Sequence, residues 1–306
     1  MYKTISWITV VLFLSYSGIR LQADEKNSAR DSSVFLDQEK FLMIFENRAK
    51  EIFEKGNFLT VENAVKQLEE TEGKTIKIRR VAPNDKVLDK SEIHSQVLKS
   101  IVVYGIAFDC GNCDLMHVNP ASGYVIDEDG LIVTNQHVIE SFTNGEDGNK
   151  NLTMQIMTSS GKVYPVIEII SASKRYDLAV VKVDTGGDKL IPIAFGEDAE
   201  VGDDVYVLSN PQGMLFYFSS GIVSRYYLLR SNPHDFHDAI PEMQITAEYA
   251  VGSSGAPVVN NKGNLVSTVS TTQSVYSNNT KNANLQMVAR GTKPIVLLKE
   301  LIKFVD

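Results

Sequence analysis

The chain has 306 residues, of which 43% are hydrophobic and 22% are charged, and its formal net charge at pH 7 is −8. This composition is typical of one large globular domain or two small ones, and it excludes wholesale disorder and collagen-like structure. The negative charge disfavours a protein that binds nucleic acid by neutralising phosphates.

Residues 1–23 have the pattern of an export signal. Lys3 gives a positive start, residues 5–14 are apolar apart from two polar positions, and the small residue Ala23 suits signal-peptidase cleavage. An uncleaved anchor is the alternative, although the apolar run is short for a membrane span. We therefore expect an exported protein of the periplasm, the cell surface or the medium, with no membrane span in the mature chain.

Residues 24–90 are expected to form a mainly helical extension. Apolar side chains at helical spacing predict a helix within residues 35–55 that ends at Gly56, and a second helix from Thr60 to Glu70. Residues 74–81 have the pattern of a strand. We expect this extension to pack on a larger domain, and an arm that binds a partner is the alternative.

Residues 91–306 have a different pattern, in which short runs of Val, Ile and Tyr alternate with turns of Gly, Asn and Asp. Many short strands at such spacing predict an all-β barrel or sandwich, and residues 294–304 predict a closing helix. The predicted strands are residues 101–107, 122–126, 131–134, 163–170, 178–183, 204–208, 221–227, 242–246, 256–259 and 264–271.

Three polar residues in this region stand beside predicted strands. His137 follows a predicted hairpin over residues 122–134, Asp177 precedes the strand at 178–183, and Ser254 lies in the tight turn Gly-Ser-Ser-Gly. A serine hydroxyl attacks a carbonyl only when a base takes its proton, and the base needs an orienting carboxylate. The N–H groups of Gly252 and Ser254 are the natural donors to a developing oxyanion.

The stretches around these residues resemble the chymotrypsin clan of serine proteases, and most closely its HtrA (Deg) branch. The resemblance implies two six-stranded β-barrels with the site between them, His137 as general base, Asp177 as its orienting group, Ser254 as nucleophile, protein or peptide substrates, and no cofactor. The matching stretches are SGYVIDEDGLIVTNQHVIE (122–140), YDLAVVKVD (176–184), GEDAEVGDDVYVLSNPQGMLFYFSSGIVSR (196–225) and QITAEYAVGSSGAPVVNNKGNLVSTVST (244–271).

The chain departs from the family pattern in two respects. The usual Gly-Asn-Ser-Gly-Gly is here Gly-Ser-Ser-Gly-Ala, so Ser253 and Ala256 replace two residues of the turn, and neither change removes a member of the triad. The segment after Ser254 is only long enough to finish a barrel and a helix, so we expect this chain to lack the PDZ domain that usually follows in the family. The family's trimer is therefore not assumed, and the oligomeric state stays open.

The resemblance also suggests residues that bind the substrate. Glu248, six residues before Ser254, is expected near the base of the primary specificity pocket, where a carboxylate favours basic side chains. HtrA-type relatives prefer small aliphatic residues, so an outward-facing Glu248 is the alternative. Tyr249 is expected in the pocket wall, and the neighbouring strand is expected to supply Ser267, Thr268 and Val269.

Cys110 and Cys113 form a lone Cys-x-x-Cys pair in a predicted loop. They are too few for a disulfide framework or a four-cysteine zinc site. We expect a small structural disulfide or a reduced pair and assign no metal; a metal site with His117 and a redox-active pair are the alternatives. For the whole chain, the alternatives to a protease are an inactive binding module with the protease fold, and a redox or metal protein built on this pair.

Overall fold

The computed structural model describes residues 35–113, 115–145, 150–230, 232, 238–277 and 284–305. The chain divides into two compact units, residues 1–37 and residues 38–306, and nearly all described residues belong to the second. The predicted export signal lies outside the described residues. Among the described residues, no helix combines the length and the apolar character needed to cross a membrane.

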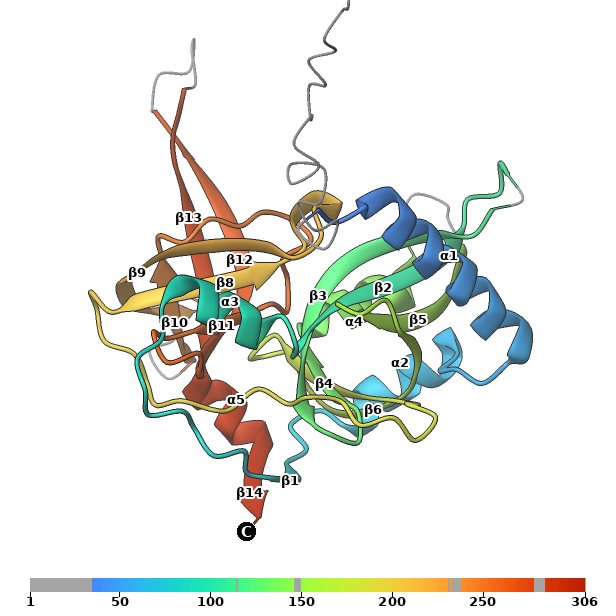
Figure 1. Ribbon diagram of the computed structural model, residues 1–306, viewed down its shortest axis with the longest axis horizontal. Coiled ribbons are helices and arrows are strands. Elements are labelled where there is room, and N and C mark those ends of the chain that lie inside the picture. Colours follow the sequence, from blue (N-terminus) through green and yellow to red (C-terminus); the bar gives the residue numbers. More distant parts are fainter. Residues whose placement is uncertain are drawn as a thin grey trace, which may run out of the picture. The chain divides into compact units, whose positions relative to one another are not determined.

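Six antiparallel strands form the first closed barrel, which carries the N-terminal half of the expected β-domain (Figure 1). These segments are rich in Val and Ile, whose β-branched side chains favour strands. Alternate side chains along each strand point into the barrel interior. Around the barrel, the order of strands is β2 (Ile101–Asp109), β3 (His117–Asp127), β4 (Leu131–Thr134), β7 (Leu178–Val183), β6 (Val163–Ser173) and β5 (Lys150–Thr158).

The second closed barrel also has six strands, so the expected all-β double barrel is confirmed. Strands β12 and β13 extend beyond this barrel as a hairpin (Figure 1). Residues 265–270 of β12 are buried, whereas residues 271–276 are exposed. The order around the barrel is β10 (Ala239–Ile245), β13 (Leu285–Pro294), β12 (Leu265–Tyr276), β11 (Pro257–Val259), β8 (Asp204–Ser209) and β9 (Tyr217–Arg230), with a short 3-10 helix, η3 (Pro211–Gly213), between β8 and β9.

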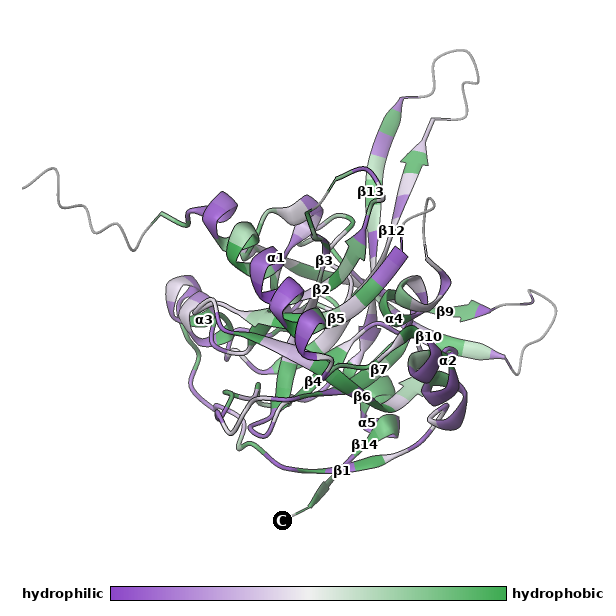
Figure 2. Ribbon diagram, turned by 90° about the vertical axis from the view of Figure 1, so that its right-hand side faces the viewer, coloured by the Kyte–Doolittle hydropathy of each residue, from purple (hydrophilic) through white to green (hydrophobic). Residues whose placement is uncertain are grey.

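Five α-helices in the described residues cover the barrels or connect their strands, and the hydropathy colouring of Figure 2 shows polar residues along the outer helices and apolar residues along the strands. Both helices expected in the extension are confirmed, and Thr60 caps the second by accepting from the backbone N–H of Asn63. The helices are α1 (Gln38–Lys55), α2 (Val61–Glu70), α3 (Lys90–Val97), α4 (Gln136–Asn144) and α5 (Ile295–Leu301).

The described part of the extension is packed on the barrels. Helix α1 lies against the first barrel, where Phe45 is fully buried beside Val103 and Met157. Two short strands, β1 (Ile76–Arg79) and β14 (Ile302–Val305), pair in parallel and join the extension to the last residues of the chain. Residues 38–79 therefore do not form a free arm. The domain boundary at residue 90 stays a prediction.

The close packing of α1 depends on a glycine in β2. A Cβ atom at Gly105 would lie 2.6 Å from two ring carbons of Phe45 and 2.6 Å from Val118 Cγ1. We expect Gly105→Ala to lower the free energy of unfolding by about 1–3 kcal/mol, measured by urea denaturation, because the added methyl group overpacks this contact. Combining it with Phe45→Leu should recover part of the loss, and strictly additive effects would contradict the direct contact.

Candidate active site

His137 lies where the first barrel faces the second. Strand β4 ends at Thr134, Asn135 occupies the N-cap position of α4, and His137 is the second residue of that helix. The backbone N–H of His137 donates to the Asp177 carboxylate at 3.1 Å. The short helix after the strand, which the sequence pattern does not predict, therefore fixes the direction of the imidazole.

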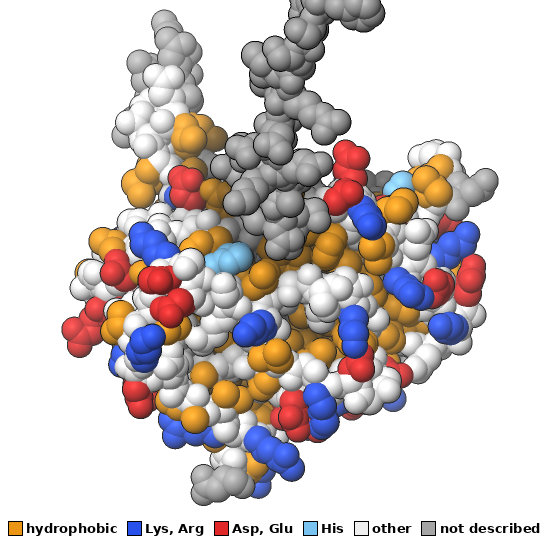
Figure 3. Space-filling view, viewed as in Figure 1, with side chains coloured by type: hydrophobic (Ala, Val, Ile, Leu, Met, Phe, Trp, Pro, Cys, Tyr) orange, Lys and Arg blue, Asp and Glu red, His pale blue; other side chains and the backbone are white. Residues whose placement is uncertain are grey.

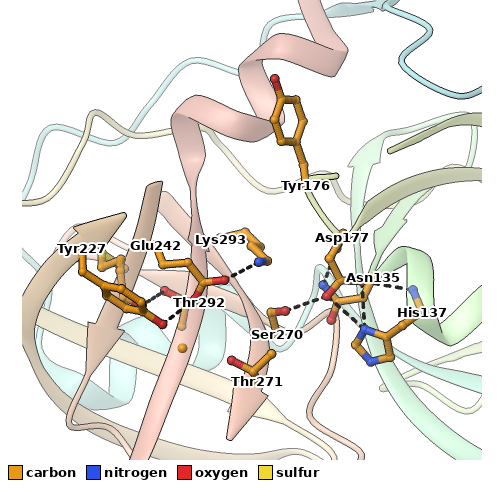
Figure 4. Close-up of polar contacts among 12 residues, drawn as sticks. Asn135, His137, Tyr176, Asp177, Tyr227, Glu242, Ser270, Thr271, Thr292 and Lys293 are labelled. Carbon is orange, nitrogen blue, oxygen red and sulfur yellow. Dashed lines mark hydrogen bonds and ion pairs between the residues drawn. The ribbon is translucent and has the colours of Figure 1, made fainter. Parts of the chain in front are cut away.

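Asp177 precedes β7 in a left-handed backbone conformation, with φ of 53°. Its backbone carbonyl accepts from the side-chain amide of the fully buried Asn135 at 2.7 Å. Its carboxylate oxygens lie 2.9 and 3.0 Å from His137 Nδ1, and one of them accepts from the Ser270 hydroxyl at 2.6 Å (Figure 4). The carboxylate is thereby held between the two barrels.

The electrostatic environment keeps Asp177 ionised. Burial acts to raise the pKa of this carboxyl, but the hydrogen bond and the charge of His137, together with the Ser270 hydroxyl, outweigh burial and lower the pKa below its ordinary value. An ionised carboxylate only accepts hydrogen bonds, so the proton of a neutral His137 belongs on Nδ1. The other ring nitrogen, Nε2, is then an acceptor.

Ser254 lies in a tight turn between β10 and β11, and its Oγ is 3.0 Å from His137 Nε2. The turn needs glycine on both sides: Gly252 has φ of 93° and Gly255 has φ of 83°, and a Cβ at Gly255 would lie 2.4 Å from the Ser122 carbonyl. The unusual Ser253 is buried and donates to Ser209 Oγ at 3.0 Å. The turn therefore forms with serine in place of the family's asparagine.

The backbone N–H of Gly252 points away from the contact that the preceding carbonyl makes. The Val251 carbonyl accepts from the backbone N–H of Gln212 at 2.7 Å, and a trans peptide directs the Gly252 N–H the opposite way. Within the described part of the chain, the N–H groups of Gly252 and Ser254 have no hydrogen-bond acceptor. These two groups are therefore available to a bound anion or carbonyl oxygen.

Two residues that the sequence analysis did not identify hold this geometry. Ser122 of β3 donates from its hydroxyl to the Gly252 carbonyl and from its backbone N–H to the Ser254 carbonyl, both at 3.0 Å. Ser270 of β12 supplies the hydroxyl that contacts Asp177. A serine in each barrel therefore bonds to the opposite barrel, which no local sequence pattern could reveal.

The residues expected along the neighbouring strand lie inside the barrel. Ser267, Thr268 and Val269 are each 1% exposed, and Thr268 Oγ1 is 2.8 Å from the Tyr124 hydroxyl. Their expected contact with substrate stays a prediction, and in this structure their side chains are buried. The strand begins to be exposed at Thr271, directly after Ser270.

Glu248 and Tyr249 point in different directions. The Glu248 side chain is 71% exposed, and its carboxylate lies 3.7 Å from the Arg290 guanidinium. Tyr249 is buried, and its hydroxyl lies 2.7 Å from the Gly291 carbonyl and 3.1 Å from the Thr271 carbonyl. Burial raises the pKa of Tyr249, so the phenol remains a neutral donor.

Cys110 and Cys113 are free thiols whose Sγ atoms lie 3.4 Å apart in the connection between β2 and β3. His117, the first residue of β3, lies beside them.

On the face shown in Figure 3, the described basic and acidic side chains are interspersed. That face therefore offers mixed charge rather than the extended basic surface that nucleic acids require.

Comparison with known proteins identifies the class of this domain. Residues 121–267 match the family model of the trypsin-like peptidase domain. That range includes the His137, Asp177 and Ser254 positions, and it joins parts of both barrels. This part of the chain is thus similar to trypsin-like peptidase domains, as the resemblance implied.

Curated proteins that are similar to this part of the chain include proteases named DegP-like and Do-like. A probable periplasmic serine endoprotease DegP-like of Brucella suis is 36% identical over 152 residues, which are 49% of this chain and 27% of that protein. The corresponding protein of Halomonas elongata is 31% identical over 47% of this chain and 28% of its own length. Protease Do-like 5, chloroplastic, of Arabidopsis thaliana is 31% identical over 47% of this chain and 46% of its own length. The chain thus spans about a quarter to a half of these relatives.

Proposed function

We propose that this chain is an exported serine endopeptidase that hydrolyses peptide bonds through an acyl-enzyme. The observation that carries this proposal is the continuous set of contacts from Asp177 through His137 to Ser254, with 2.9 Å and 3.0 Å at its two hydrogen bonds. In this set Ser254 is the nucleophile, His137 the general base and Asp177 the group that orients the imidazole.

The geometry supports a two-step reaction. Ser254 Oγ attacks the substrate carbonyl while His137 Nε2 accepts its proton, and the oxyanion that forms accepts from the N–H groups of Gly252 and Ser254. His137 then gives the proton to the leaving amine. A water molecule, activated by the same imidazole, attacks the ester and releases the acid product.

The most direct test is labelling of the full chain with a fluorophosphonate probe, followed by mass spectrometry of the modified peptide. We expect covalent modification at Ser254 and no modification of the Ser254→Ala variant. An unlabelled but correctly folded wild-type chain would instead favour the inactive binding module. Export is supported by the N-terminal sequence and by the names of the periplasmic relatives, and fractionation of the source cells tests it.

The contacts of Glu248 and Tyr249 favour small aliphatic side chains at the residue before the cleaved bond. The Glu248 carboxylate points to solvent and to Arg290, while the buried Tyr249 occupies space between β12 and β13. The Arg290 guanidinium, with Nε 3.4 Å from the Tyr249 carbonyl, disfavours a second cation nearby.

We therefore expect peptides with Val or Ala before the cut to have a kcat/KM at least about 10-fold above that of matched Arg or Lys peptides. Glu248→Gln should leave this order unchanged, because the carboxylate is exposed and lies beside Arg290. A preference for Arg and Lys that disappears in Glu248→Gln would restore the acidic pocket expected from the sequence.

A further inference from the structure

Three side chains that ligate soft metal ions converge at the connection between β2 and β3. Their ligand atoms, which are the sulfurs of Cys110 and Cys113 and a ring nitrogen of His117, all lie within 4.8 Å of one another. Cys113 Sγ is 3.4 Å from Cys110 Sγ and 3.1 Å from His117 Nε2. This group belongs to the first barrel and contains none of the residues that the proposed reaction uses.

The spacing of these atoms is close to that of a zinc coordination shell. Zinc bonds of ordinary length in a tetrahedral shell separate two sulfurs by about 3.8 Å, and a sulfur from a nitrogen by about 3.6 Å. A disulfide requires a sulfur separation of about 2.05 Å, which is far shorter than the 3.4 Å between Cys110 and Cys113. An increase of a few tenths of an ångström in each of the separations from Cys113 Sγ would therefore bring them to the values of a zinc site.

A second observation comes from the other side of the imidazole. The His117 ring directs Nε2 to the sulfurs, and its Nδ1 lies 4.0 Å from a carboxylate oxygen of Glu46 on α1. Histidines that bind metal commonly give their second ring N–H to a carboxylate, which fixes the ring and strengthens the ligand. A disulfide between the two cysteines would give this arrangement of His117 and Glu46 no role.

We propose that Cys110, Cys113 and His117 bind one Zn²⁺ ion, with water at the fourth position and Glu46 as the partner of the imidazole. On binding, the two thiols lose their protons, and the two thiolates balance the charge of the ion. Cys113 is exposed and Cys110 is partly exposed, so an ion and its water can reach them.

The position of this site gives it a consequence for the protease domain. Glu46 also lines a cavity of about 340 Å³ together with Val118, Pro120 and Gly252. Binding at His117 would thus fasten α1 to β3 at the edge of the cavity that reaches the turn of Ser254. The ion stabilises the folded chain by as much as it binds that chain more tightly than the unfolded one, in which Glu46 of α1 is not held beside His117.

The test uses the full chain, reduced and freed of metal, and titrated with Zn²⁺ against a chromophoric chelator. We expect one ion per chain and a higher Tm with zinc. Cys113→Ser and His117→Gln should each weaken zinc binding by at least about 100-fold, and Glu46→Gln by about 10-fold or more. His94→Gln is the matched control, because His94 packs edge-on against Phe218 in another part of the fold and should leave zinc binding unchanged.

These measurements do not depend on peptide hydrolysis, and repeating them with Ser254→Ala separates the two proposals. Replacement of zinc by Co²⁺ should give a thiolate-to-cobalt absorption band that Cys113→Ser removes. The proposal is overturned if the reduced chain binds no zinc, if Cys113→Ser binds zinc as tightly as the wild type, or if the protein is isolated with a Cys110–Cys113 disulfide that after reduction takes up no ion.

Discussion

Ser254→Ala and His137→Ala should each lower kcat for peptide hydrolysis by about 10⁴-fold or more. The first removes the attacking oxygen, and the second removes the acceptor that lies 3.0 Å from it. Each substitution disables the attack of Ser254 on the substrate carbonyl, so the kcat of the double variant should be little lower than that of either single variant. Steady-state hydrolysis of a fluorogenic peptide with Val before the cut measures the effect.

Two control variants distinguish loss of chemistry from loss of folding. Ser253→Ala removes the neighbouring hydroxyl, which faces Ser209 and not His137, and it should retain most of the activity. His94→Gln removes a histidine far from the triad in sequence and should behave likewise. Wild-type rates in a folded Ser254→Ala variant would show that another group performs the reaction.

Local sequence patterns predicted much of this fold because each depends on residues that are close in the chain. The strands at residues 131–134 and 178–183 match β4 and β7 at both ends, and turn residues precede each of them. The motifs around His137, Asp177 and Ser254 each place a polar residue next to a strand. The structure brings these three residues together in the arrangement that the family resemblance implies.

Interactions between distant segments explain what the sequence could not supply. The sequence analysis does not identify Ser270, because this residue is distinguished only by its contact with Asp177, 93 residues away. Strand β13 was not predicted, since much of it extends beyond the barrel, where no buried face imposes alternation. Similarly, nothing local to His117 indicates that Glu46 of α1 lies beside it.

Helix α3 begins with a capping box in which Asp89 accepts from the backbone N–H of Glu92 and the Glu92 side chain accepts from that of Asp89. The sequence Asp-Lys-Ser-Glu carries that signal in full. The weak apolar periodicity of the following residues concealed the helix. A capping-box pattern thus indicates the start of a helix even where the apolar spacing of the following residues is weak.

Asp177→Asn should lower kcat by about 10⁴-fold while leaving the fold intact. The carboxylate accepts from three donors: the backbone N–H of His137, its ring Nδ1 and the Ser270 hydroxyl. An asparagine has the same shape, but its amide donates to Nδ1 and moves the imidazole proton to Nε2. That tautomer cannot accept the proton of Ser254, so the nucleophile is not activated. Fluorophosphonate labelling should slow by a similar factor.

The same substitution changes how stability depends on pH, which separates the role of charge from that of shape. The folded-state pKa of Asp177 is lowered, so its ionised form stabilises the fold above the unfolded-state value of about 4, and this contribution is lost as pH falls through the folded-state pKa. Asp177→Asn lacks that contribution and should lose less stability than the wild type on acidification. Urea denaturation at pH 7 and near pH 3 measures this difference, with Asp85→Asn as a control carboxylate. If the wild type and Asp177→Asn lost equal stability on acidification, Asp177 would not be held ionised by His137 and Ser270. The argument about the imidazole tautomer would then lose its basis.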